Sequence, residues 1–312
     1  MIHRQVSLSK SCHSPKKNIL SSPNQKTIRE LINDISFQFE ESDIFYGHGT
    51  DNAFDEAVYL VFSILDLSFE ISDDQLNNLV DQDSSNRIDE SVNKRITERI
   101  PLAYLVNKAW FLGLQYYVDE RVLIPRSPIA ELIEQQFQPW LMKADKVKNI
   151  LDIGTGSGCI AIAAAMAFTS AMVDAIDVSK DALDVAQINV ENHKLTDRIK
   201  LLMSDIYQNI GQQKYDLIIA NPPYVDATDM DVLPAEYRHE PGIGLAAGVD
   251  GIDVVSRIIA ESKKHLTDNG LLIVEVGNSQ AAVEKAFPKI PFTWLEFERG
   301  GEGVFLLTAE NL

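Results

Sequence analysis

The sequence has little positive charge: its 312 residues include 28 Lys and Arg against 46 Asp and Glu, a net charge of −18. A chain this acidic would be repelled by a nucleic-acid backbone or an anionic membrane unless its charges are segregated, so we expect neither as a direct partner. It has only two cysteines, Cys12 and Cys159, which excludes a disulfide framework and favours a reducing cytoplasm. No apolar run approaches the roughly 20 residues that span a bilayer.

Hydrophobic residues make up 45% of the chain, which excludes disorder over its whole length. Residues 1–26 show no hydrophobic period and predict a flexible extension, with a transit peptide as the alternative; the missing apolar region excludes a signal peptide. Residues 27–102 carry apolar stripes at helical spacing and predict a helical bundle. Substrate recognition by this bundle is a separate hypothesis. Within it we expect a short helix after Ser72 and a longer one that Pro101 stops.

Residues 103–125 are rich in aromatic and β-branched side chains around Gly113 and predict a hairpin linker. Ser127 and Pro128 then predict the start of a helix that continues through Leu141. Strand-like runs alternate with helical patterns from there on, and lie at residues 149–153, 172–176, 200–203, 216–220, 271–276, 292–297 and 303–308. This alternation predicts an α/β domain over residues 126–312 with a mostly parallel sheet. The last strand should be antiparallel, because only residues 299–302 separate it from the preceding run and the two runs must form a hairpin.

A glycine-rich turn follows the first of these runs, with the sequence Asp152-Ile153-Gly154-Thr155-Gly156-Ser157-Gly158. Glycines let a ligand approach the backbone, and the following helix presents free N–H groups. The dinucleotide-binding pattern has a glycine at the position of Cys159, so this turn departs from it. Asp177 ends the next strand, where its carboxylate can accept hydrogen bonds from ribose hydroxyls. The combination favours S-adenosylmethionine over NAD; the alternatives are a tight strand-to-helix turn and, for Asp177, a helix cap. Asp205, after the third run, can reach an adenine amine or can equally be a cap.

The strand at 216–220 ends in Asn221-Pro222-Pro223-Tyr224. Ligands bind at the carboxyl ends of strands in open α/β sheets. The Asn221 amide oxygen and the Pro222 carbonyl are two acceptors that can hold an NH₂ group, and Tyr224 supplies a flat face for a planar amide or base. The pattern predicts methylation of a weakly basic planar nitrogen, for which orientation matters more than a strong base. An ordinary turn that ends a strand is the alternative.

These residues resemble the class I S-adenosylmethionine-dependent methyltransferases of the N(5)-glutamine type, over nearly everything from residue 27 onward. That family joins an N-terminal helical bundle to a seven-stranded Rossmann-like domain. One branch acts on peptide-chain release factors, the other on a glutamine of large-subunit ribosomal protein number three. The second branch is the more similar at three segments, residues 103–111, 123–132 and 233–241.

The resemblance implies a role for each motif residue and implies no metal. The cofactor, S-adenosylmethionine, would be held by Asp152, Gly154, Thr155, Gly156, Gly158, Asp177, Asp205 and Asn221. The catalytic residues would be Asn221, Pro222 and Tyr224, and the substrate would also meet Pro223 and Arg126. Ser127 either borders the same pocket or caps a helix. The alternative functions are release-factor methylation, N6-adenine methylation of nucleic acid and a non-catalytic binding module.

The acidic charge is concentrated in residues 40–90, which hold 14 Asp and Glu against one Arg, a net of −13. One interpretation is a solvated helical surface. The other is a docking face for a basic ribosomal protein, in which case added salt raises the apparent KM for the protein substrate. A KM that salt leaves unchanged would exclude docking through charge.

Overall fold

The computed structural model describes residues 25–226, 230, 232–245, 247–248 and 251–312. The chain divides into two compact units between Lys108 and Ala109, and each is described by itself. The sequence placed this boundary at residues 102 and 103 and a linker after it. The predicted extension, residues 1–26, lies outside the described residues except for its last two positions. None of the helices in the described ranges is both long and apolar enough to cross a membrane.

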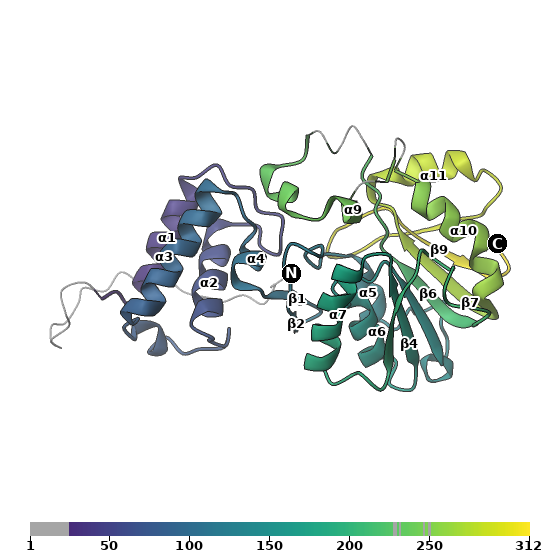
Figure 1. Cartoon of the computed structure of the whole chain (residues 1–312), viewed down its shortest axis with the longest axis horizontal. Coiled ribbons are helices and arrows are strands. Elements are labelled where there is room, and N and C mark those ends of the chain that lie inside the picture. The colour runs from purple at the N-terminus through teal and green to yellow at the C-terminus, as the bar shows by residue number, and fades with distance from the viewer. Residues whose placement is uncertain (1–24, 227–229, 231, 246, 249–250) are drawn as a thin grey trace. The chain divides into compact units, whose positions relative to one another are not determined.

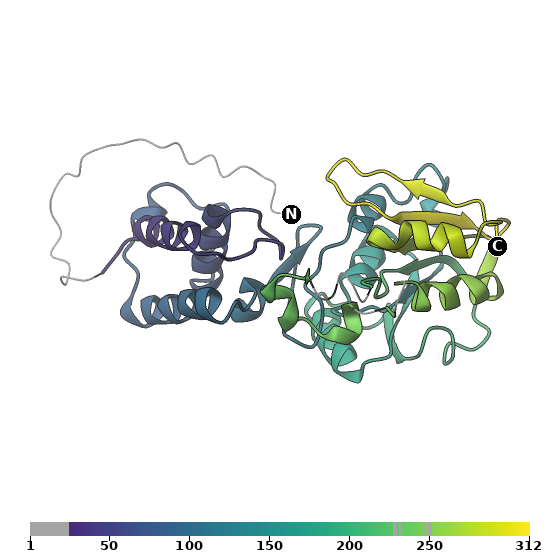
Figure 2. The same cartoon turned by 90° about the horizontal axis from the view of Figure 1, so that it is seen from above.

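The first unit is helical, as predicted, and is coloured purple to blue in Figures 1 and 2. Its helices are α1 (Ile28–Glu40), α2 (Ala53–Ile64), α3 (Gln82–Thr97) and α4 (Leu102–Val106). Helix α1 begins at a complete capping box, in which Thr27 and Glu30 satisfy each other's backbone N–H groups. Its apolar stripe is buried, from Ile28 to Phe39, so hydrophobic burial holds this helix in place.

Two helix predictions in this unit were wrong in extent. Ser72 and Gln75 do exchange capping hydrogen bonds, but they start only a 3-10 turn, η1 (Gln75–Asn77), because Asp81 soon caps α3. Helix α3 ends at Thr97, before Pro101, since Arg99 adopts a left-handed φ of 61°. Pro101 instead precedes α4 and occupies its N-cap position.

The predicted hairpin is present but shorter than residues 103–125. Strands β1 (Ala109–Phe111) and β2 (Leu114–Tyr116) pair across Leu112 and Gly113, which both have positive φ, as a type I′ turn requires. Residue 104, expected to be extended, lies in α4. Helix α5 (Ile129–Glu134) also stops before the predicted Leu141. Phe137 takes a left-handed φ of 56° there and is buried against Phe168.

The second unit contains the predicted seven-stranded sheet, in the order β5-β4-β3-β6-β7-β9-β8. Its strands are β3 (Asn149–Ile153), β4 (Met172–Asp177), β5 (Ile199–Met203), β6 (Tyr215–Ala220), β7 (Leu266–Glu275), β8 (Thr293–Leu295) and β9 (Val304–Thr308). The first five pair in parallel, and β9 lies antiparallel between β7 and β8, as expected for the final strand. This is the Rossmann-like architecture that the sequence predicted.

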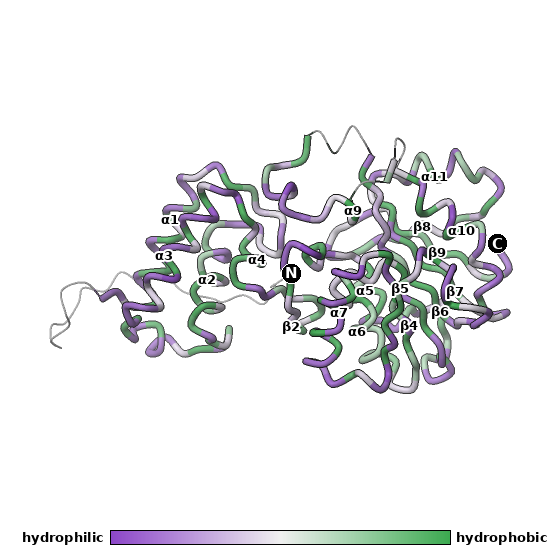
Figure 3. The backbone as a smooth tube through the Cα atoms, viewed as in Figure 1, coloured by the Kyte–Doolittle hydropathy of each residue, from purple (hydrophilic) through white to green (hydrophobic). Residues whose placement is uncertain are grey.

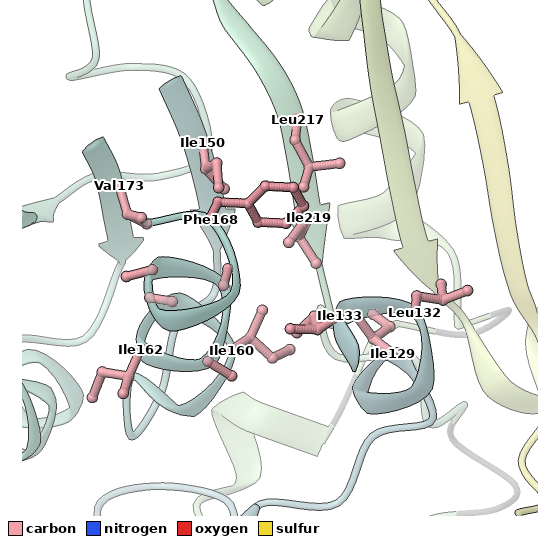
Figure 4. Packing of buried hydrophobic residues seen from close by; sticks show 14 of the residues in the cluster. Ile129, Leu132, Ile133, Ile150, Ile160, Ile162, Phe168, Val173, Leu217 and Ile219 are labelled. Atoms are coloured by element: carbon pink, nitrogen blue, oxygen red, sulfur yellow. The ribbon is translucent and has the colours of Figure 1, made fainter. Parts of the chain in front are cut away.

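Helices cover both faces of the sheet, because successive residues of the central strands point to opposite sides. In β6, Leu217 and Ile219 face α5 and α6 (Cys159–Ala167), which Figure 4 shows. Ile218 faces the cluster of α10 (Asp253–His265) and α11 (Gln280–Ala286) on the other side. Helix α7 (Lys180–Asn192) packs beside α6. Figure 3 colours the central strands mainly hydrophobic. The described residues of this unit also form the short elements η2 (Ala144–Lys146), η3 (Ala235–His239), α9 (Gly242–Leu245) and η4 (Gly277–Ser279).

Candidate active site

Five parallel strands end at one edge of the sheet and bring the predicted site segments together. The register sets Ile153, the last residue of β3, beside Ile176 of β4 and Ala220 of β6. Ala220 in turn lies beside Val274 of β7. The glycine-rich turn, Asp177 and the Asn-Pro-Pro-Tyr turn therefore follow neighbouring strands, where an open α/β sheet binds ligands.

The glycine-rich turn needs its glycines for conformational reasons. Gly154, Gly156 and Gly158 have φ values of 71°, 54° and 81°, in the left-handed region that other residues rarely adopt. The turn is anchored because the N–H groups of Gly154 and Thr155 both donate to the Ile176 carbonyl, each at 2.9 Å. A Cβ atom at Gly156 would meet nothing within 4 Å, so this position of the turn borders open space.

Asp152 lies under the turn with one carboxylate oxygen engaged and one without a partner. Its Oδ2 accepts hydrogen bonds from Thr155 Oγ1 at 2.6 Å and from the Ala161 N–H at 3.1 Å. Its Oδ1 is buried and receives no hydrogen bond within the described residues. Burial raises the pKa of Asp152 to about 7, although these two donors favour the ionised form. A buried acceptor without a donor suits a cationic ligand group.

Asp177 and Asp205 both have partners within the protein. Asp177 accepts from the N–H groups of Gly156 at 3.0 Å and Ser179 at 2.9 Å, and burial raises its pKa. The first of these hydrogen bonds ties the glycine-rich turn to the end of β4. Asp177 does not cap α7, because the N-cap residue of that helix is Ser179, whose side chain accepts a backbone N–H of the first turn. Asp205 is more exposed and forms an ion pair with Arg257 of α10 at 2.8 Å. Each carboxylate oxygen has further lone pairs, so these contacts leave acceptor capacity.

The Asn-Pro-Pro-Tyr turn lies directly beside the glycine-rich turn. A Cβ atom built on Gly154 would be 3.9 Å from the carbonyl oxygen of Asn221. Pro222 is buried, whereas Asn221 and Pro223 are half-buried. In the part of the chain that the structure describes, no side chain or backbone group hydrogen-bonds to the Asn221 amide. The two motifs that the sequence singled out thus lie next to each other.

Glu275 is a site residue that sequence reasoning missed. It ends β7, is only 3% exposed, and accepts from the Tyr224 hydroxyl at 3.0 Å and from the Ser127 hydroxyl at 2.5 Å. Ser127 Oγ also accepts the Ile129 N–H at 3.2 Å. The N-cap residue of α5 is Pro128, one position after Ser127. The available signal was a lone acidic residue inside the apolar run at 271–276.

Arg126 was predicted to meet the substrate, and the structure gives it a protein partner. Its guanidinium binds the Glu240 carboxylate through two nitrogens, each at 2.5 Å, and lies 5.1 Å from the Tyr237 ring centroid. Glu240 also accepts the Ile124 N–H at 3.0 Å. The pair joins two of the segments on which the family resemblance rests, at 123–132 and 233–241.

Asn189 of α7 is a second residue that the sequence did not reveal. Its buried side chain accepts the Tyr117 N–H at 2.7 Å and donates to the Tyr117 carbonyl at 2.9 Å and the Ser157 carbonyl at 2.8 Å. It thereby fixes the glycine-rich turn to the chain that leaves the hairpin. A polar residue on the apolar face of a predicted helix was the only signal.

The burial of Glu275 gives a pH-dependent stability prediction. Burial raises the pKa of Glu275 to about 7, although the Ser127 and Tyr224 hydroxyls and the charge of Arg126 favour ionisation. The folded state thus binds this proton more tightly than the unfolded state, whose glutamate pKa is about 4.3. The wild type therefore loses stability as pH rises from about 4.3 through about 7, and E275Q does not share that loss.

We expect the free energy of unfolding of E275Q, relative to wild type, to increase by up to about 3 kcal/mol between pH 5 and pH 8. Urea unfolding of both proteins at the two pH values measures this difference. Asp152 titrates in both proteins, so its contribution cancels. If the free energies of unfolding of E275Q and wild type differ by the same amount at pH 5 and pH 8, Glu275 does not titrate in this range.

Comparison with known proteins gives the class first. The family model described as Methyltransferase small domain matches residues 136–235, so this part of the chain is similar to methyltransferases. One solved structure, the hMettl16 catalytic domain in complex with MAT2A 3'UTR hairpin 1, aligns with a TM-score of 0.48 and 19% identity, covering 80% of this chain and 88% of that one. A likeness this distant carries no argument about activity.

Much closer relatives define the family. A ribosomal protein uL3 glutamine methyltransferase of Francisella tularensis is 46% identical over 289 residues, covering 93% of this chain and 92% of the relative. Proteins of the same name from Burkholderia pseudomallei and Neisseria meningitidis serogroup B are 46% and 44% identical, each over 92% of this chain and over 96% and 94% of their own lengths. The chain belongs to the ribosomal protein uL3 glutamine methyltransferase family.

Proposed function

We propose that this protein transfers a methyl group from S-adenosylmethionine to the side-chain amide nitrogen of one glutamine in ribosomal protein uL3. The observation that carries the proposal is the contact between the two turns, where the Gly154 Cβ position lies 3.9 Å from the Asn221 carbonyl. A ligand on the glycine-rich turn and an amide on Asn221 would therefore be neighbours. The names of the relatives supply the substrate protein.

The residues of the glycine-rich turn fit this cofactor. Asp152 Oδ1, a buried acceptor without a donor in the described chain, suits the ammonium of the methionine part. Asp177 has acceptor capacity for ribose hydroxyls, and Asp205 for the adenine amine. S-adenosylmethionine supplies a sulfonium methyl group when bound. Gly156 leaves room for its approach, since a Cβ there would meet no protein atom within 4 Å.

The Asn-Pro-Pro-Tyr turn orients the glutamine amide. The Asn221 side-chain oxygen and the Pro222 carbonyl accept the two N–H groups, which turns the nitrogen lone pair toward the methyl group. In methyl transfer the N–C bond would form as the S–C bond of the sulfonium breaks, which would leave a neutral thioether, and one proton would then leave the nitrogen for solvent. Because the proton leaves after transfer, orientation and desolvation provide the acceleration, and no strong base is needed.

The charge of the first unit supports a basic protein partner in the cytoplasm. Most of the acidic residues in 40–90 are exposed, among them Asp43, Asp66 and Asp73. Glu56 is the exception, because it is buried in an ion pair with Arg95 at 2.5 Å. A segment of this charge attracts a basic ribosomal protein and repels nucleic acid, which disfavours adenine methylation.

Methyl transfer from labelled cofactor tests the proposal. We expect the purified protein to label one large-subunit protein, uL3, in a ribosomal-protein extract from cells lacking this enzyme. Label in release factors alone would reject the substrate, and label in DNA or RNA would reject the reaction class. Pre-methylated extract from wild-type cells is the matched control and should accept no label.

A further inference from the structure

The environment of Tyr224 is built by one short segment at the end of β7. Glu275 accepts the hydrogen bond of the Tyr224 hydroxyl at 3.0 Å. Ser279 Oγ donates to the Tyr224 carbonyl at 3.0 Å. Gly277 lies against the ring, because a Cβ atom there would come within 2.5 Å of Tyr224 Cε2. The hydroxyl, ring and backbone of Tyr224 are therefore all held by residues 275–279.

Glu275 also ties this assembly to the segment that precedes α5. Its second carboxylate oxygen accepts from Ser127 at 2.5 Å, next to Arg126, which binds Glu240. One buried carboxylate thus joins three segments: the end of β7, the turn after β6 and the start of α5. A buried carboxylate is costly to desolvate, and an apolar residue would continue the β7 run at lower cost. Glu275 therefore makes the protein less stable than an apolar residue would, and in return it accepts hydrogen bonds from two hydroxyl groups in a defined arrangement.

We propose that Glu275 is a positioning residue for methyl transfer, which fixes the plane of the Tyr224 ring against which the substrate amide lies. The inference rests on the proposed function of the Asn-Pro-Pro-Tyr turn. Without the carboxylate, the ring loses its hydroxyl anchor and can tilt. The amide would then populate misdirected orientations, and small misalignments are costly when orientation supplies most of the acceleration. Cofactor binding, on the neighbouring turn, would be unaffected.

A double-mutant cycle tests this role. E275Q, Y224F and the double variant are compared for kcat and KM with uL3 and for the Kd of S-adenosylmethionine. We expect each single variant to lower kcat about tenfold, with the cofactor Kd within about twofold of wild type. The double variant should be no slower than the slower single variant, because both changes remove the same contact. E131Q is the matched control: Glu131 is also buried and accepts two backbone N–H groups, from Glu298 and Arg299, and its change should leave kcat intact.

Three results would overturn the proposal: full kcat in E275Q, losses that multiply in the double variant, or cofactor affinity that falls as much as kcat. NMR of ring-labelled tyrosine gives a readout that needs no activity. The Tyr224 ring signals should shift in E275Q and stay in place in E131Q. If the wild type is inactive on uL3 and the Tyr224 signals still shift in E275Q, only the proposed function is refuted. If the wild type is active on uL3 and the Tyr224 signals do not shift in E275Q, only the positioning role is refuted.

Discussion

Asn221→Ala is expected to lower kcat for methyl transfer by about a hundredfold to a thousandfold while leaving the Kd of S-adenosylmethionine within about twofold. The side chain would lose the oxygen that accepts one amide N–H of the substrate, so the nitrogen lone pair would no longer be directed. The backbone carbonyl of residue 221, which lies beside Gly154, would remain. The separation of kcat from cofactor affinity is therefore the informative result.

Asn149→Ala is the matched control for this substitution. Asn149 begins β3, at the opposite edge of the sheet from the site, and is half-buried like Asn221. Its replacement should leave both kcat and cofactor affinity close to wild type. Calorimetry for the cofactor and single-turnover kinetics for transfer give the two quantities. An Asn221→Ala protein that binds cofactor and keeps full activity would refute the proposed role of the turn.

Gly156→Val is expected to weaken S-adenosylmethionine binding by about a hundredfold or more, which corresponds to about 2.7 kcal/mol. Gly156 has a φ of 54°, which a β-branched residue adopts only under strain, and its N–H holds Asp177. The new side chain would also enter the open space beside the turn, where we place the cofactor. Both effects act on the cofactor site.

Gly211→Val separates these effects from general strain. Gly211 has a φ of 67°, and a Cβ there also meets nothing within 4 Å, but it lies in the loop before β6, at the other edge of the sheet. The two variants should lose similar amounts in thermal midpoint, and only Gly156→Val should lose cofactor affinity. Equal affinities in the two variants would show that the glycine-rich turn does not hold the cofactor.

The sheet could be predicted from the sequence because its strands carry strong local signals. Apolar runs such as 216–220 favour strands that are buried on both faces of a covered sheet, and a strand forms at each of the seven predicted runs. The turns at Gly154 and Asn221 were predictable for the same reason: each directly follows a strand. The apolar run that forms each strand and the turn residues that end it lie within a few positions of each other in the sequence, so local patterns suffice to predict both.

The contacts that complete the site could not be predicted, because they join distant parts of the chain. Glu275 lies 148 residues from Ser127 and 51 from Tyr224. Asn189 lies 72 residues from Tyr117. No local pattern encodes which buried polar residue meets which partner. Helix ends failed for a related reason, since the turn at Phe137 follows from tertiary packing against Phe168 rather than from propensity.

The most direct test of the central claim is mass spectrometry of ribosomal proteins from cells that lack this chain. We expect uL3 to be lighter by the mass of one CH₂ unit, because a hydrogen stands where the methyl group would be. The loss should lie on a single glutamine, and complementation with the wild-type chain should restore the mass. Complementation with Asn221→Ala should fail to restore the mass at equal protein levels. A uL3 of unchanged mass in the deletion cells would contradict the proposed function.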